Sequence, residues 1–191
     1  TAFEKVQMDM WFNTNDGPMA KPAGRKAVDA VFEMEDVTEH FVGPTGSRTY
    51  APFPSRMAEA WDFPVERWRE IPRSKDVESA KATFTREVKQ SEDVSSGWHP
   101  TVAVPKHDML REKVGEKLVH GLKEAGLTRA RTEKYPFSTF REMVLSGSSS
   151  DYDLFVGSWT GGPDPDTFLY PLFREEMAGR TNGTFFSDPA V

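Results

Sequence analysis

The sequence has no cysteine among its 191 residues. This absence excludes a disulfide scaffold, zinc–thiolate sites, iron–sulfur clusters and a cysteine nucleophile. It is compatible with either side of a membrane, so it does not indicate a compartment. Long apolar runs are missing as well, because no stretch approaches the ~20 residues that a membrane-spanning helix needs.

Positive charge is in deficit. There are 24 Lys and Arg residues against 30 Asp and Glu residues, which gives a net charge of −6. The basic residues are scattered rather than gathered in a stripe, so we expect no nucleic-acid partner. Large rings are plentiful, with 14 Phe, 5 Trp and 4 Tyr, and this excludes disorder of the whole chain. The length suits one sizeable domain.

The motifs of common catalytic sites are also missing. The four histidines follow no metal-binding spacing: His40, His99, His107 and His120. There is no G-x-S-x-G elbow, no G-x-G-x-x-G turn and no P-loop lysine. We therefore expect no catalytic residue, no metal and no cofactor.

Hydrophobic periodicity predicts an α/β fold. Strands are expected over 6–13, 98–104, 127–135 and 152–157. Helices are expected over 22–42 with a break at 33–36, over 76–89 and over 107–125, with Gly126 as its left-handed end. A last helix is expected to start at Pro136 with Ser138 as its N-cap. The alternation predicts one compact domain with helices packed on a mixed sheet.

The segment 43–72 is predicted to be a long loop, because proline and glycine interrupt it repeatedly. It carries five rings: Tyr50, Phe53, Trp61, Phe63 and Trp68. Long ordered loops are often functional. The alternative is that these rings only fix the loop to the core of the domain, and we favour this second interpretation.

Two Asp-x-Asp pairs, Asp151/Asp153 and Asp164/Asp166, are candidates for Mg²⁺ or Mn²⁺ binding in a sugar or phosphoryl transferase. No phosphate-binding loop and no third acidic ligand accompany them. Asn182-Gly183-Thr184 matches a glycosylation sequon, but Asn-Gly is also a turn signal, which is the interpretation we prefer.

The segment 152–173 is the strongest candidate for a binding surface. A buried strand leads into a Gly161-Gly162-Pro163 loop with Trp159 at its mouth. Ligands of open α/β sheets bind beyond the carboxyl ends of the strands. Glycines let a ligand approach the backbone closely, and a tryptophan offers a flat apolar wall with one N–H donor. No general base accompanies this surface, so it indicates binding rather than catalysis.

The same segment resembles the extracytoplasmic solute-binding proteins of family 5, which serve ABC importers of peptides, nickel and related solutes. The resemblance rests on Tyr152-Asp153-Leu154, Trp159-Thr160-Gly161 and the run from Asp164-Pro165-Asp166 to Leu169. Further segments agree in order and spacing and extend the resemblance over about residues 8–191: Phe12-Asn13-Thr14, Arg25–Val28, Tyr50–Pro54, Asp76–Lys81, Ala125-Gly126-Leu127 and Phe186–Val191.

The resemblance implies that residues 1–191 are the C-terminal α/β lobe of a longer, two-lobed periplasmic-binding-protein-like fold of type II, cut short after residue 191. It implies a non-enzymatic protein that captures a peptide or related solute outside the cytoplasm, in a periplasm or anchored to a cell surface. The implied partners are the solute, the other lobe of the same protein and ABC permease subunits.

The resemblance also implies the site: Trp159 as a wall for the solute, Thr160, Gly161 and Gly162 as hydrogen-bonding groups, and Asp164 as a lesser candidate. Peptide-binding members typically place an aspartate three residues after the tryptophan, where it pairs with the α-amino group of the ligand; this chain has Gly162 there. Either Asp164 substitutes for it or the solute has no free amine. We expect Asp166 to cap the turn or helix that follows. The metal-dependent transferase and a solute-sensing lobe of a regulator stay open as alternatives.

Overall fold

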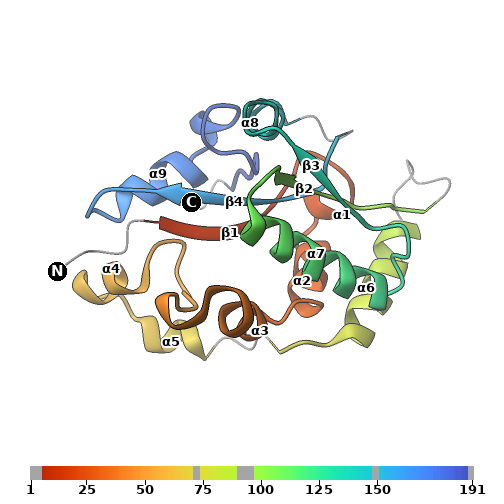
Figure 1. The fold of residues 1–191 in the computed structure, drawn as a ribbon, viewed down its shortest axis with the longest axis horizontal. Coiled ribbons are helices and arrows are strands. Elements are labelled where there is room, and N and C mark those ends of the chain that lie inside the picture. The colour runs from red at the N-terminus through yellow and green to blue at the C-terminus, as the bar shows by residue number, and fades with distance from the viewer. Residues whose placement is uncertain (1–5, 71–73, 90–96, 148–150, 189–191) are drawn as a thin grey trace.

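The structure is a computed structural model that describes residues 6–70, 74–89, 97–147 and 151–188 (Figure 1). Its sheet contains β1 (Val6–Phe12), β2 (Thr101–Pro105), β3 (Arg131–Tyr135) and β4 (Leu154–Thr160), in the spatial order β1-β4-β2-β3. Strand β2 pairs in parallel with both β3 and β4, whereas β1 pairs antiparallel with β4. The prediction of a mixed sheet is confirmed.

Helices cover both faces of this sheet. The longer ones are α2 (Pro22–Ala30), α6 (Val77–Lys89), α7 (Met109–Glu124), α8 (Phe137–Ser146) and α9 (Asp166–Phe173). The shorter ones are α1 (Gly17–Ala20), α3 (Met34–Val37), η1 (Thr38–Val42), η2 (Gly43–Thr45), α4 (Ser55–Ala60), α5 (Val65–Arg69) and η3 (Glu175–Met177). Within the described ranges, no helix is long and apolar enough to cross a membrane.

The core has two layers because side chains alternate across each strand. On one face, Val102, Val104, Leu154 and Val156 pack against α2, α6 and α7. On the other face, a smaller cluster packs strand residues against α8 and α9; its members are Trp11, Ala103, Phe140, Met143, Val144, Tyr152, Phe155 and Leu172. In Figure 1 the sheet accordingly runs between α8 and α9 on one side and α2, α6 and α7 on the other.

Several predicted boundaries need correction. The helical break lies at 31–33 instead of 33–36, because the helix resumes at Met34. Strand β3 begins only at Arg131, since the Ala130 N–H donates to the Leu127 carbonyl and forms a turn there. The N-cap position of α8 is Pro136, and no side chain caps it, so the prediction of Ser138 as N-cap is wrong. Gly126 has φ +93°, the left-handed conformation expected of it.

The segment 43–72 is not a plain loop, because it contains η2, α4 and α5. Its rings behave as predicted by the core interpretation. Phe53 is 1% exposed and has ring contacts with Phe63 and Trp68, with centroids 5.2 and 6.4 Å away. Two rings are exceptions. Trp61 is 53% exposed and donates its indole N–H to the Pro163 carbonyl. Tyr50 is not part of the buried cluster, and its ring contacts the guanidinium groups of Arg48 and Arg69.

The turn at Asn182 also agrees with the preferred interpretation. Asn182 is fully buried, and its Oδ1 accepts hydrogen bonds from the backbone N–H groups of Thr184 and Phe185. A buried side chain that organises its own turn is unsuited to glycosylation.

Asp153 ties the start of β4 to the start of β2. Its Oδ1 accepts the Trp98 indole N–H at 2.7 Å, and its Oδ2 accepts the Thr101 backbone N–H at 2.8 Å. Burial raises the pKa of Asp153, and these two hydrogen bonds oppose that rise. This aspartate therefore has a structural task at the amino end of the strand.

We predict that Asp153→Asn lowers the free energy of unfolding by about 1–3 kcal/mol, because the new amide group would face a buried N–H donor. Urea unfolding of the protein measures this change. Asp29→Asn is the control, because Asp29 is exposed and its substitution should change stability by less than about 0.5 kcal/mol. Equal effects of the two substitutions would contradict a structural role for Asp153.

Candidate functional site

Three connecting segments meet at the carboxyl edge of the sheet. Met109 begins α7 soon after β2, Phe137 begins α8 directly after β3, and residues 160–164 follow Trp159 at the end of β4. Because β2, β3 and β4 are parallel, their carboxyl ends lie at one edge. Met109 is 81% exposed and Phe137 is 62% exposed, so this edge presents apolar side chains to the surroundings.

Trp159 lies within β4, which runs three residues beyond its predicted end at Gly157. It pairs with Gln7 of β1. Its half-buried ring packs against two hydrophobic clusters, the one that contains Phe155 and the one that contains Phe53. Its indole N–H donates to the Thr167 carbonyl at 2.8 Å. The ring is thus held firmly, and its one donor is already used within the chain.

The turn after β4 contains two glycines, of which Gly161 has no room for a side chain and Gly162 has. A Cβ atom on Gly161 would lie 2.3 Å from Cε2 of Phe168, so no larger residue fits there. A Cβ on Gly162 would meet nothing closer than Thr167 Cγ2 at 3.4 Å. Thr160 and Gly162 are both exposed to solvent at the carboxyl edge of the sheet.

Asp164 closes this turn. Its Oδ1 accepts the Asp166 backbone N–H at 2.9 Å, and its carbonyl accepts the Thr167 hydroxyl at 2.6 Å. Asp166 is the first residue of α9 and makes no capping hydrogen bond, so the prediction that Asp166 caps is wrong. Asp164 is nevertheless exposed, which leaves its second carboxylate oxygen beside the edge.

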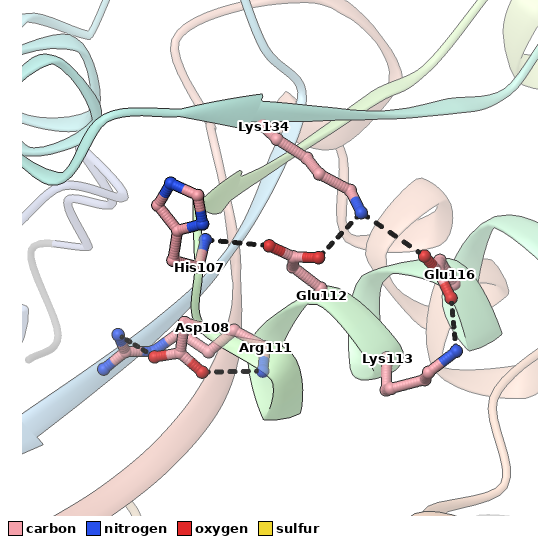
Figure 2. A network of polar contacts seen from close by, with 7 residues as sticks. All are labelled: His107, Asp108, Arg111, Glu112, Lys113, Glu116 and Lys134. Atoms are coloured by element: carbon pink, nitrogen blue, oxygen red, sulfur yellow. Dashed lines mark hydrogen bonds and ion pairs between the residues drawn. The ribbon is translucent and has the colours of Figure 1, made fainter.

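Arg111 is a residue that motif analysis of the sequence missed. Its Nη1 contacts Asp108 Oδ2 at 2.8 Å, and its Nη2 donates to the Ser158 hydroxyl of β4. Figure 2 shows its guanidinium pointing away from Lys134 and towards β4. The only signal in the sequence is an Asp–Arg pair three residues apart at a helix start.

A polar network fixes the first turns of α7 to β3 (Figure 2). Glu112 accepts the His107 backbone N–H at 2.9 Å and the Lys134 ammonium at 2.7 Å. The Lys134 ammonium lowers the pKa of Glu112, and Glu112 in turn raises the pKa of Lys134. Most of these groups are exposed, so the network orients the helix start rather than contributing much stability.

Two cavities adjoin the edge. The first, about 300 Å³, lies beneath Trp159 between β4 and α8. The second, about 720 Å³, lies between β1 and the segment 46–55. Asp9 lines the second cavity and accepts the Gln7 amide N–H at 2.9 Å; burial raises the pKa of Asp9 to about 6.

The two Asp-x-Asp pairs do not come together. Asp153 precedes β4 and Asp164 follows it, and a seven-residue strand is about 20 Å long. Both oxygens of Asp153 accept N–H groups, as described above. Among the described residues, no three acidic, histidine or cysteine side chains are grouped so that they could hold a metal ion. The geometry therefore gives no support to the transferase alternative.

Residues 8–179 match the sequence profile of the bacterial extracellular solute-binding proteins, family 5 (middle). No curated protein sequence matches the chain. Among solved structures, a Helicobacter pylori periplasmic binding protein DppA in complex with a peptide is similar, at 17% identity and TM-score 0.77 over 97% of this chain and 34% of that one. The oligopeptide-binding protein AppA from Bacillus subtilis is similar at 16% identity and TM-score 0.78, over 97% of this chain and 37% of that one.

The murein tripeptide binding protein MppA of Escherichia coli is a third similar structure, at 18% identity and TM-score 0.69 over 98% of this chain and 35% of that one. These likenesses establish the fold, which is that of a periplasmic-binding-protein-like lobe. The chain spans about a third of the length of these three structures.

The raised pKa of Asp9 predicts a pH-dependent stability. The folded carboxyl titrates near pH 6 against 3.8 for the ordinary group, so the folded state holds this proton more tightly. Stability from this proton is present below about pH 4 and is lost as the pH rises through about 6. We expect Asp9→Asn, which resembles the protonated form, to raise the free energy of unfolding at pH 7 but hardly at pH 4.

Urea unfolding between pH 4 and pH 8 measures this difference. Asp29→Asn is the matched control, because Asp29 is an exposed carboxylate that lines the same cavity. A stability difference for Asp9→Asn that stays constant over this pH range would contradict the prediction.

Proposed function

Because the chain belongs to the bacterial extracellular solute-binding proteins of family 5, we propose that it is part of the solute-binding component of an ABC import system. In this role it captures a peptide or related small solute outside the cytoplasm and delivers it to the membrane permease subunits. It acts by binding and release, without chemical turnover.

The observation that supports this proposal best is the construction of the carboxyl edge. Trp159 and Phe137 line a cavity of about 300 Å³. Met109 and the Gly161–Gly162 turn belong to the same edge of the sheet but are not among the residues that line this cavity. This arrangement of a few rings and polar backbone groups around a hollow suits a small organic solute. Among the residues that the structure describes at this edge, no pair of groups could act as nucleophile and base.

We propose further that residues 1–191 form a single lobe, the C-terminal one of a two-lobed protein. The similar structures are about three times as long as this chain, which supports the idea. A second lobe would cover the exposed side chains of the carboxyl edge and enclose the solute by a hinge motion. Trp159, Thr160, Gly161, Gly162 and Asp164 would then supply this lobe's half of the site.

A solute-sensing lobe of a regulator would use the same edge, so the two roles differ in their partners rather than in this site. The import role requires that the solute-loaded protein binds the permease and that uptake of the solute depends on it. Reconstituted uptake into vesicles that contain the permease therefore separates the two roles.

The substitution Trp159→Ala tests the site. We expect the complete protein to lose at least about tenfold in solute affinity, because a ring that walls the solute is removed. Some stability will also be lost, since Trp159 packs against two clusters and its hydrogen bond to Thr167 disappears. Calorimetric titration measures the affinity, and urea unfolding measures the stability.

Trp98→Ala is the matched control. Trp98 is also buried against a ring and also donates its indole N–H within the chain, but it lies near the amino end of β2. It should cost stability and leave the affinity within about twofold. If Trp98→Ala weakened solute binding as much as Trp159→Ala, the location of the site would be wrong.

The solute itself is sought by a thermal-shift screen of the complete protein. The panel holds neutral and acidic peptides with free and acetylated amino ends, sugars, opines and nickel chelates. A solute that binds only the folded state at a hundredfold excess over Kd adds about 2.7 kcal/mol of stability. Failure of every solute, together with a shift by Mg²⁺ or Mn²⁺ plus a nucleotide sugar, would overturn the proposed function.

A further inference from the structure

The cavity beneath Trp159 has an unusual distribution of charge. Three arginines line it, namely Arg111, Arg141 and Arg180, and no described lining residue is acidic. The chain as a whole has 30 acidic residues against 24 Lys and Arg. An excess of positive charge at this one hollow therefore runs against the composition of the chain.

Two of these arginines lack a partner within the described ranges. Arg141 on α8 and Arg180 near Asn182 are exposed, and neither guanidinium makes a hydrogen bond or an ion pair with a described residue. The nearby carboxylate of Asp9, which lies on the Trp11 face of β1, lines the other cavity and is hydrogen-bonded to Gln7. The positive charge of Arg141 and Arg180 is thus available to a bound group.

Two buried donors that belong to residues lining the same cavity also lack an acceptor among the described residues. Trp11 is 8% exposed, and its indole N–H has no hydrogen-bond partner among the described residues. The Nε of Arg111 is likewise buried and unpartnered, although its Nη1 contacts Asp108. Buried donors without acceptors are rare and costly, so their presence at one cavity is an independent indication of a ligand rich in acceptor atoms.

Most of the remaining lining is apolar, with Ser158 and Thr181 as the polar exceptions. Phe137, Phe140, Val144 and Phe155 line the cavity together with Gly157, where a Cβ would lie 3.1 Å from the Trp11 indole nitrogen. The missing side chain at Gly157 keeps the hollow open beside that donor. The cavity therefore combines an apolar lining with a cationic rim.

From these observations we propose that the cavity receives an acidic group of the solute, a carboxylate carried on an apolar stem, and that the solute class of this protein is anionic. The inference rests on the proposed function, because it assumes that a solute binds at the carboxyl edge. Arginine suits the role, since its planar guanidinium can bind both oxygens of a carboxylate. Gly162 agrees with it, because no carboxylate at that position would repel an anionic solute. Asp164, the carboxylate of the same turn, does not line the cavity.

The test compares two probes that differ only in charge. They are N-acetyl-phenylalanyl-glutamic acid amide and N-acetyl-phenylalanyl-glutamine amide, so neither has a free amino end or a terminal carboxylate. Calorimetric titration of the complete protein should show at least about tenfold tighter binding of the glutamate probe, because its hydrogen bonds are charge-assisted. This preference should shrink as the salt concentration rises.

Arg141→Gln and Arg180→Gln should each reduce the preference at least about threefold, and the double variant should abolish it. Arg67→Gln is the matched control, since Arg67 is an exposed arginine on α5 that does not line the cavity. It should leave the preference unchanged. Arg141 and Arg180 are exposed, so their replacement should not unfold the protein.

Equal binding of the two probes, tighter binding of the glutamine probe, or no binding of either would overturn the anionic pocket. So would a preference that survives in the double variant. The solute screen separates this failure from that of the proposed function, because it contains neutral solutes. Binding of a neutral solute alone would keep the solute-binding role and refute the anionic class.

Discussion

Strand β4 lies between β1 and β2 and is hydrogen-bonded to both, and the rest of the structure depends on this position. Its residues alternate between the two layers of the core, with Val156 in one and Phe155 in the other. The seven-residue pairing with β1 carries the strand out to Trp159 and sets Trp11 opposite Phe155. Asp153 fixes its amino end, whereas its carboxyl end carries the candidate site. One strand thus links the stability of the fold to the candidate site.

The two ends of β4 show how similar residues serve different tasks. Trp98 and Trp159 both donate an indole N–H within the chain, one to a buried carboxylate and the other to a backbone carbonyl. Trp159 also lines the cavity between β4 and α8, so its ring can be both a structural support and a wall for a solute. A site built on a central strand is held more rigidly than one built on a mobile loop. A substitution in such a site therefore changes both the stability of the fold and the affinity for the solute.

Much of the fold could be predicted from the sequence, because the apolar spacing of β1, β4, α6 and α7 is regular. Helices α4 and α5 were missed since Pro54 and Pro64, taken as loop signals, are in fact the N-cap residues of these helices. The extension of β4 over Ser158–Thr160 was missed because it depends on pairing with the distant residues 6–8. The arginines around the cavity come from three segments, and only the folded chain brings them together.

The most direct test of the central claim is hydrogen–deuterium exchange of the complete protein with and without a solute found in the screen. The claim is that the carboxyl edge of this sheet is half of a solute site. We predict that the solute slows exchange in residues 109–111, 137–141 and 157–162 more than elsewhere in this lobe. Protection confined to the segment 46–55 beside the larger cavity, or to the amino edge of the sheet, would contradict the account.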